Sequence, residues 1–379
     1  MNTLRVGLFT ECYRPIQNGI VASVDALVSA IRAQGHEVVC VTPNMPGYSD
    51  AQEFVVRVPS LPLPTRTSYR LTIPLLSNER IARALERLSI VHTHSAFVTG
   101  WMGARAARRA HVPHVFTYHT QLEEYAHYFP LESRLTRNAA ASLTRSHCNA
   151  AAVVIVPTQA MERHLRDLGV RSRIEVVPSG IDVGFFAAGR RREDLRRRLG
   201  VPPGGKMIAA VGRLGREKNL ELALESFARL GLPEARLVLI GDGPHREPLE
   251  RAAQRLDIAG LTTFAGEYPR ETLPDVYASA DALVFTSRSE TQGLVLAEAL
   301  AAGVPVVAVD TPQTRDVLDG AGTIVPGEPE AVAAALAATL GALRRPPISA
   351  ARFDATATGE RILAIYAELI GASQVAAAV

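Results

Sequence analysis

Residues 282–310, ALVFTSRSETQGLVLAEALAAGVPVVAVD, contain a complete strand–helix–strand unit. The apolar run 282–286 predicts a buried strand, and the polar residues 287–291 predict a turn into a helix that ends at Gly303. A second apolar strand follows at 304–309. Strands that alternate with helices in this way predict an α/β fold with a parallel sheet.

Two carboxylates, Glu290 and Glu298, lie eight residues apart here, the first in the turn and the second about two helical turns later. The exposed amides of Gly293, Leu294 and Val295 at the helix N-terminus favour an anion. A ligand with a diphosphate and hydroxyl groups on both sides of it fits this pattern. Taken alone, the stretch fits an ordinary strand–helix–strand unit that binds no ligand about equally well. Because Glu298 has almost only apolar or small neighbours, its ionised side chain requires a partner.

Length and composition limit the class of protein. At 379 residues the chain exceeds what one hydrophobic core usually supports, and 47% hydrophobic residues are typical of globular α/β proteins. Its three cysteines are widely spaced, which indicates reduced thiols in a cytoplasmic protein. The chain contains no apolar run of a signal peptide or of a transmembrane helix. We therefore expect a cytoplasmic protein with two domains.

The net charge of +3 hides an asymmetry between the two halves. Residues 1–180 hold 19 basic and 13 acidic residues, a net charge of +6, whereas residues 181–379 hold 22 and 25, a net charge of −3. Arginine clusters in the basic half fit anionic lipid or nucleic acid, but a solvated helix face is the commoner meaning. We expect no nucleic-acid partner.

The first half of the chain alternates predicted strands and helices, beginning with a strand at 5–10 and a helix at 20–34. Between them, Asn18 and Gly19 form a turn that permits a positive φ angle and a close approach of an anionic ligand to backbone N–H groups. Plain turn chemistry is the more common meaning of such a glycine. Residues 43–76, rich in proline and arginine, are expected to form surface loops.

Three histidines end predicted strands in this half. His92 and His94 end a strand at 90–94, and because no third ligand is nearby, a structural role is favoured over a metal site. His119 follows a strand at 112–118, where open α/β sheets place ligand contacts, and a structural histidine is the alternative.

Aromatic and basic residues are mixed in the segment that follows His119. Aromatic rings at the depth of lipid headgroups and cations that face anionic lipid suit a membrane interface, but core packing explains such residues equally well. The candidates for contact with an acceptor or a membrane are Asn18, Tyr125, Tyr128, Arg134 and Arg137.

The second half begins with a strand at 206–211 that leads into Gly212 and a loop with two separated cations, Arg213 and Lys218. The loop lacks the Gly-Lys-Ser/Thr ending of a P-loop, but two cations aimed at one diphosphate can replace a divalent metal in stabilising a leaving group. Strands and helices alternate from there to a terminal helix at 355–370, which predicts a second doubly wound sheet.

The motifs fall in the order found in one enzyme family. The spacing from Glu290 to Glu298 resembles the E-x7-E motif of retaining glycosyltransferase family 4. Each further motif is weak alone, whereas their common order over essentially the whole chain makes a strong match. The further motifs are Asn18-Gly19, Tyr118-His119, Gly212-Arg213 to Lys218-Asn219, and Gly241-Asp-Gly-Pro244.

The resemblance implies a GT-B fold, an α/β architecture in which two doubly wound, Rossmann-like domains face each other across a cleft. It implies an acceptor-binding domain at 1–185 and a nucleotide-sugar-binding domain at 200–350. The terminal helix at 355–379 is expected to return toward the first domain.

The resemblance also implies a role for particular residues. Glu298 is expected to hold the ribose hydroxyls, Glu290 to contact the hexose, and the loop of Tyr268 to receive the base. The implied catalytic residues are His119, Arg213, Lys218 and Glu290. The implied donor-binding residues are Gly19, Gly212, Tyr268, Gly293, Leu294, Val295 and Glu298.

The implied activity is metal-independent transfer of a hexose, with retention, from a nucleotide sugar to an acceptor hydroxyl, with no cofactor and no metal. The segments ETQGL and YHTQLEEYAHYF resemble the branch that glucosylates diacylglycerol at a membrane surface. This favours UDP-glucose over GDP-mannose, a lipid over a glycan acceptor, and a peripheral location on the inner face of the cell membrane. Asn18 and Gln292 replace the glycine and phenylalanine of many members, which leaves the hexose open.

Other functions fit the same fold. A sugar-nucleotide 2-epimerase needs acid and base groups that no motif places. A non-catalytic protein that binds a sugar nucleotide or a lipid is disfavoured because Arg213, Lys218, Glu290 and Glu298 are all present. A glycosidase is poorly supported because its carboxylates must flank a scissile bond.

Overall fold

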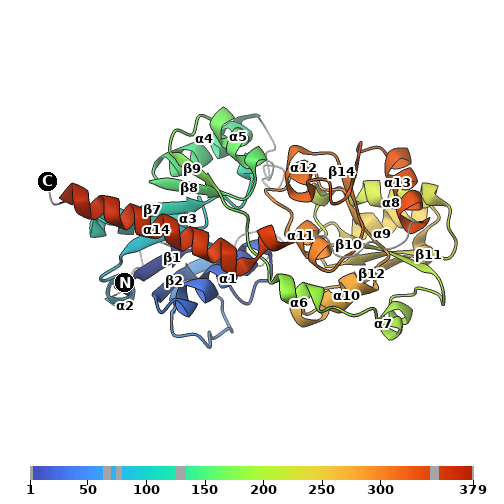
Figure 1. Ribbon diagram of the computed structural model, residues 1–379, viewed down its shortest axis with the longest axis horizontal. Helices are drawn as coiled ribbons and strands as arrows, with labels where there is room; N and C mark the ends of the chain where they lie inside the picture. The colour runs from blue at the N-terminus through green and yellow to red at the C-terminus, as the bar shows by residue number, and fades with distance from the viewer. Residues whose placement is uncertain (1–2, 63–69, 74–78, 124–133, 342–349, 378–379) are drawn as a thin grey trace. The chain divides into compact units, whose positions relative to one another are not determined.

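The computed structural model describes residues 3–62, 70–73, 79–123, 134–341 and 350–377. The chain divides into two compact units (Figure 1). Unit one consists of Met1–Ile181 and Ala355–Val379, and unit two of Asp182–Asp354. Each unit is built on one parallel sheet, and helices connect most of its successive strands, which confirms the predicted α/β fold.

Unit one has a seven-stranded sheet in the order β3-β2-β1-β6-β7-β8-β9, and every pair of neighbours is parallel. The strands are β1 (Arg5–Phe9), β2 (Glu37–Pro43), β3 (Val55–Val58), β6 (Ile90–Thr93), β7 (His114–Thr117), β8 (Val153–Val156) and β9 (Arg173–Val176). Its helices are α1 (Gly19–Ala33), α2 (Glu79–Ala84), α3 (Val98–Ala110), α4 (Arg134–Asn149), α5 (Gln159–Asp167) and α14 (Ala355–Ala377).

The prediction of surface loops over 43–76 is wrong for Val55–Val58, which forms the edge strand β3 with three of its four residues buried. An antiparallel pair, β4 (Ser60–Pro62) and β5 (Arg70–Thr72), follows it. These strands are three or four residues long, and so short an alternation as that at 54–58, among prolines and arginines, does not by itself distinguish a strand from a loop.

Helix α14 packs against α1 although more than 300 residues separate the two helices in the chain. A Cβ atom at Gly359 would lie 2.2 Å from the Cβ of Ala30, so the glycine permits a close approach of the two helices. Ile362, Leu363 and Tyr366 of α14 are buried in the same hydrophobic cluster as the central strands.

Unit two has a six-stranded sheet in the order β12-β11-β10-β13-β14-β15, again with parallel neighbours. The strands are β10 (Lys206–Val211), β11 (Ala235–Ile240), β12 (Thr262–Gly266), β13 (Ala282–Phe285), β14 (Val306–Val309) and β15 (Thr323–Val325). The helices are α6 (Val183–Ala187), α7 (Glu193–Arg198), α8 (Leu220–Leu230), α9 (Arg246–Arg255), α10 (Leu273–Ser279), α11 (Leu294–Ala301), α12 (Pro312–Leu318) and α13 (Pro329–Gly341).

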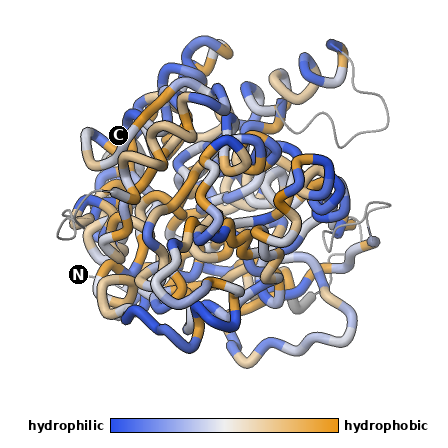
Figure 2. Tube along the Cα trace, turned by 90° about the vertical axis from the view of Figure 1, so that its right-hand side faces the viewer, coloured by the Kyte–Doolittle hydropathy of each residue, from blue (hydrophilic) through white to orange (hydrophobic). Residues whose placement is uncertain are grey.

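The cores consist mainly of the strands and of the helix faces that cover them. Figure 2 shows hydrophobic segments concentrated inside and hydrophilic residues on much of the outer trace. The run 188–200 contains a fully charged stretch, yet Arg196 within it is buried. Its guanidinium donates to the Ser279 carbonyl at 2.6 Å and to Asp281 Oδ2 at 2.9 Å, so this run is packed into unit two.

Buried histidines are a feature of unit one. Thr93 Oγ1 lies 2.9 Å from His114 Nε2 and 3.2 Å from His147 Nε2, and all three side chains are buried. Burial lowers the pKa of His114 to about 4 and that of His147 to about 3. Both histidines are therefore neutral in the folded protein at pH 7.

We predict that acid destabilises unit one. A histidine with a lowered folded-state pKa stabilises the protein above its unfolded pKa of about 6.5, and this stabilisation is lost as the pH falls toward the folded value. Each such histidine is expected to cost about 1.4 kcal/mol per pH unit below 6.5. The only tryptophan of the chain, Trp101, lies on α3 beside His147, so its fluorescence in urea measures unfolding of this unit.

The control compares two variants. His147→Phe should make the pH dependence of the urea midpoint shallower, whereas His111→Asn, which changes an exposed histidine in the left-handed conformation, should leave it unchanged. Equal midpoints at pH 7 and pH 5 for the wild-type protein would contradict the prediction.

Candidate functional site

The strand order of unit two places two candidate loops side by side. Strand β10 pairs with β13, and the connections from these two strands leave in opposite directions across the sheet. Open α/β sheets bind ligands at such a switch point, outside the carboxyl ends of the strands. The loop after β10 carries Arg213 and Lys218, and the loop after β13 carries Glu290.

Backbone contacts fix the loop after β10. Leu214 N–H donates to the Asp242 carbonyl at 2.9 Å, and His245 N–H donates to the Leu214 carbonyl at 2.9 Å. A Cβ at Gly241 would lie 2.0 Å from the Gly212 carbonyl oxygen. The glycine after β11 therefore allows its loop to lie against the loop that bears the two cations.

Lys218 and Glu290 form an ion pair between Nζ and Oε1, and both side chains are mostly buried. Two hydroxyl groups after β13 hold the backbone of the cationic loop. Thr286 donates to the Lys218 carbonyl at 3.0 Å, and Ser287 donates to the Glu217 carbonyl at 3.2 Å. The two loops thus form one connected unit in which the ion pair has a fixed position.

Arg213 is held by a carboxylate of its own loop. Its Nη2 donates to Glu217 Oε1 at 2.7 Å, and the Glu217 side chain is only 2% exposed while that of Arg213 is 29% exposed. The buried carboxylate therefore holds a guanidinium that still reaches solvent.

Glu298 has the partner that the sequence analysis required. Tyr277 of α10 donates its hydroxyl to Glu298 Oε2 at 2.6 Å, and the tyrosine is completely buried. Burial raises the pKa of Glu298, and the Tyr277 hydrogen bond and the positive charge of Arg270 oppose this rise. The Tyr277 hydrogen bond thus holds the Glu298 carboxylate on one side, and a carboxylate has sites for further hydrogen bonds.

The N-terminus of α11 lies between the two glutamates. Gly293 is its N-cap with φ at 74°, a left-handed conformation that glycine adopts without strain. The amides of Gly293, Leu294 and Val295 lie at the helix start, where amides have no acceptor within the helix. This arrangement suits an anion beside Glu290.

The candidates in unit one lie at the carboxyl ends of its strands. Gly19 begins α1 after β1, and Asn18 is its N-cap, with Oδ1 accepting from the Val21 N–H at 2.9 Å. His119 follows β7, and its Nε2 lies 3.0 Å from Nδ1 of His94. In unit two, Tyr268 lies in the loop after β12.

The acceptor and membrane candidates are only partly described. Arg134 and Arg137 are exposed on α4, next to Leu135, whose exposed fraction is 79%. Tyr125 and Tyr128 lie outside the described residues. Within the described ranges, no helix is long and apolar enough to cross a bilayer, and no cluster of three or more His, Cys, Asp or Glu side chains is arranged to hold a metal ion.

Three contacts of the candidate residues were not identified from the sequence: Glu217 with Arg213, Tyr277 with Glu298, and His94 with His119. The apolar surroundings of Glu298 showed that a partner was needed, but the partner lies 21 residues away on another helix. Two histidines that follow neighbouring parallel strands were the available signal for the histidine pair, because such strands end at the same edge of a sheet.

Two family profiles match consecutive parts of the chain. The profile "Glycosyltransferase Family 4" matches residues 17–185, and "Glycosyl transferases group 1" matches residues 191–352. An alpha-monoglucosyldiacylglycerol synthase of Streptococcus pneumoniae is 31% identical over 83% of this chain and 73% of its own length. The chain belongs to glycosyltransferase family 4. It is an enzyme that transfers a hexose from a nucleotide sugar.

Other relatives agree with this assignment. A GDP-mannose-dependent alpha-mannosyltransferase of Mycobacterium tuberculosis is 33% identical over 83% of this chain and 81% of its own length. The solved structure of Anabaena HepE in complex with UDP and glucose superposes with a TM-score of 0.76 at 17% identity, covering 97% of this chain and 100% of that one. The predicted GT-B fold is thereby confirmed.

We predict that Tyr277→Phe weakens nucleotide binding by this glycosyltransferase. The variant leaves the Glu298 carboxylate without the hydrogen bond that holds it in place, and we expect a misplaced carboxylate to lower nucleotide affinity about 10-fold, or about 1.4 kcal/mol. Loss of this bond raises the pKa of Glu298 further, so affinity should begin to fall at a higher pH than in the wild-type enzyme as the solution is acidified. Isothermal titration with UDP and GDP between pH 8 and pH 5.5 measures both effects.

Tyr13→Phe is the matched control, since the Tyr13 hydroxyl donates to Asp25 at 2.6 Å in unit one. This variant should bind nucleotide like the wild-type enzyme. Unchanged affinity and unchanged pH dependence in Tyr277→Phe would show that the tyrosine does not support the nucleotide site.

Proposed function

We propose that this enzyme transfers glucose from UDP-glucose to a hydroxyl group of a membrane lipid such as diacylglycerol, with retention and without a metal ion. The observation that carries the proposal is the ion pair between Lys218 and Glu290 at the switch point of unit two, in the loop that leads into the helix of Glu298. The cations of the loop after β10, together with the helix amides and two carboxylates after β13, match a diphosphate flanked by two polyols.

These groups fit the sugar nucleotide in one orientation, with its ribose at Glu298 and its hexose at Glu290. An ammonium has three donors, so Lys218 can hold Glu290 and a phosphate oxygen together. The amides of Gly293 and its neighbours and the guanidinium of Arg213 add positive charge around the diphosphate. Glu298 accepts from the ribose hydroxyls, and Glu290 accepts from hydroxyls of the hexose. Tyr268 and its loop receive the base.

The chemistry follows from where charge develops. The bond between the anomeric carbon and the diphosphate oxygen breaks, and negative charge grows on that oxygen. Lys218 and Arg213 stabilise this charge, an effect worth about 3 kcal/mol per donor. The acceptor hydroxyl attacks from the same face, its oxygen bonds to the anomeric carbon, and its proton passes to the departing diphosphate oxygen. His119 contacts the hexose near the reacting carbon.

The lipid acceptor is supported by the relatives and by one surface. The Streptococcus pneumoniae relative is an alpha-monoglucosyldiacylglycerol synthase. Helix α4 exposes Arg134 and Arg137 beside an exposed leucine, a combination suited to anionic lipid headgroups at the inner face of the cell membrane. The mannosyltransferase relative makes GDP-mannose the second candidate donor.

The decisive experiment offers UDP-glucose, UDP-galactose and GDP-mannose with and without diacylglycerol, in the presence of a chelator. We expect consumption of UDP-glucose and formation of a glucolipid only with the lipid. Lys218→Met should lower the rate at least about 100-fold, the size found on removing one transition-state donor. Glu290→Gln removes the negative charge that pairs with Lys218 and should also lower the rate. Transfer from GDP-mannose alone, transfer that requires a divalent metal, or wild-type rates in both variants would each reject part of the proposal.

Membrane binding has a separate test. Sedimentation with vesicles of phosphatidylglycerol and phosphatidylcholine should show binding that weakens as salt is raised from 0.05 to 0.5 M. Arg134→Glu combined with Arg137→Glu should weaken binding about 30-fold or more, at roughly 1 kcal/mol per basic residue. Arg108→Glu with Arg109→Glu makes the same charge change on α3 and should have a smaller effect. Equal losses in both double variants would show that α4 is not the docking helix.

A further inference from the structure

His94 and His119 form a pair at the edge of the sheet in unit one. They follow the neighbouring strands β6 and β7, and their rings stack with centroids 5.2 Å apart and planes inclined by 22°. His94 Nδ1 lies 3.0 Å from His119 Nε2, which is a hydrogen-bond distance. His94 is 3% exposed, whereas His119 is only partly buried. The hidden ring therefore supports the more accessible one.

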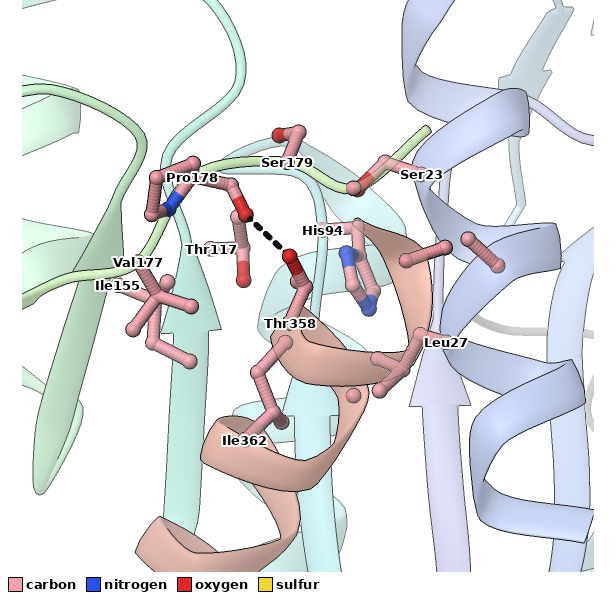
Figure 3. A pocket seen from close by; sticks show the side chains of 14 residues that line it. Ser23, Leu27, His94, Thr117, Ile155, Val177, Pro178, Ser179, Thr358 and Ile362 are labelled. Carbon is pink, nitrogen blue, oxygen red and sulfur yellow. Dashed lines mark hydrogen bonds between the residues drawn. The ribbon is translucent and has the colours of Figure 1, made fainter. Parts of the chain in front are cut away.

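The other nitrogen of His94, Nε2, is buried and has no hydrogen-bond partner among the residues that the structure describes. Figure 3 shows this ring beside Thr117 and Thr358 in a small pocket where α14 crosses the ends of the strands. The enclosed space is about 10 Å³, close to the minimum for one water molecule. A buried imidazole nitrogen next to such a polar space is expected to bind water.

Both rings are neutral imidazoles, and the hydrogen bond between them couples their tautomers. Burial lowers the pKa of His119 to about 4 and holds that of His94 well below its ordinary value, so each ring carries one N–H at pH 7. One proton serves the hydrogen bond between them, and its position determines the tautomer of both rings. A partner at His94 Nε2 therefore influences which nitrogen of His119 carries its proton.

Helix α14 forms one wall of this pocket. Thr358 donates to the Pro178 carbonyl at 3.1 Å, and Gly359 lies beside it. Behind His94, the ring of His92 lies 4.2 Å away, with Nδ1 2.5 Å from the Tyr366 hydroxyl and Nε2 2.6 Å from Thr117 Oγ1. His94 thus packs against a ring that two hydrogen bonds hold in place, which limits rotation of its own ring.

We propose that His94 is a positioning residue for His119, and that one water molecule in the pocket completes the hydrogen bonds of His94. The catalytic part of this inference rests on the proposed function, in which His119 contacts the hexose. The pairing and the water do not depend on that function, and they are tested separately.

The kinetic test uses three substitutions. Asparagine places a hydrogen-bonding atom near the position of Nδ1, glutamine places one near Nε2, and phenylalanine keeps the ring without either. We expect His94→Phe and His94→Gln to lower kcat about 10- to 100-fold, as expected for a misplaced catalytic group, with an unchanged KM for the sugar nucleotide. His94→Asn should recover most of the rate. Equal rates in all three variants, or equal losses in all three, would reject positioning through Nδ1.

A double-mutant cycle separates positioning from folding. In a His119→Ala background, His94→Phe should cause little further loss of kcat, because the group that it positions is absent. Additive losses would show that His94 acts independently of His119. If His119→Ala leaves transfer unchanged, the role of His119 in the proposed function fails, and the next measurement decides the pairing.

The structural test needs no catalysis. Nitrogen-15 spectra of the enzyme with labelled histidine should show one dominant tautomer for His119 in the wild-type protein and in His94→Asn, and a mixture of tautomers in His94→Phe. A high-resolution crystal structure should show one water within hydrogen-bond distance of His94 Nε2. Identical His119 signals in wild type and His94→Phe would overturn the pairing, and an empty pocket would overturn the water.

Discussion

The ion pair between Lys218 and Glu290 is the interaction on which the site of unit two depends. It joins loops that lie far apart in the chain and that the pairing of β10 with β13 brings together. Hydroxyl groups of Thr286 and Ser287 hold the same two loops through backbone carbonyls. Each charge therefore has a partner without a ligand. In the proposed reaction the donor meets groups that are already oriented, which lowers the reorganisation required.

The two units share one strand order over six strands, with a seventh strand in unit one, and they differ in the chemistry at their strand ends. Unit two presents ionised groups that pair with one another, as in Arg213 with Glu217. Unit one presents neutral histidines at His94 and His119, because burial disfavours the charged imidazole. The first arrangement suits a charged diphosphate. The second suits hydroxyl groups, for which a neutral ring can donate or accept a hydrogen bond.

The sequence predicted most strands and helices because parallel strands buried on both faces are continuous apolar runs, as at 282–286 and 304–309. It also predicted that Glu298 needs a partner, since its neighbours are apolar. It did not predict Tyr277, because the pairing depends on how two helices pack. The buried Arg196 and the short strand β3 were missed for related reasons, since local composition does not show that a distant carbonyl or a neighbouring strand covers a segment.

Helix α14 completes unit one from the far end of the chain. The whole of unit two is therefore synthesised before α14 can pack against α1 at Ala30 and bond to His92. At a synthesis rate of about 5–20 residues per second, this interval lasts on the order of ten seconds or more. This apolar face must be kept from aggregating throughout that time. All residues of unit two are made before α14, so unit two can complete its fold while unit one still lacks this helix.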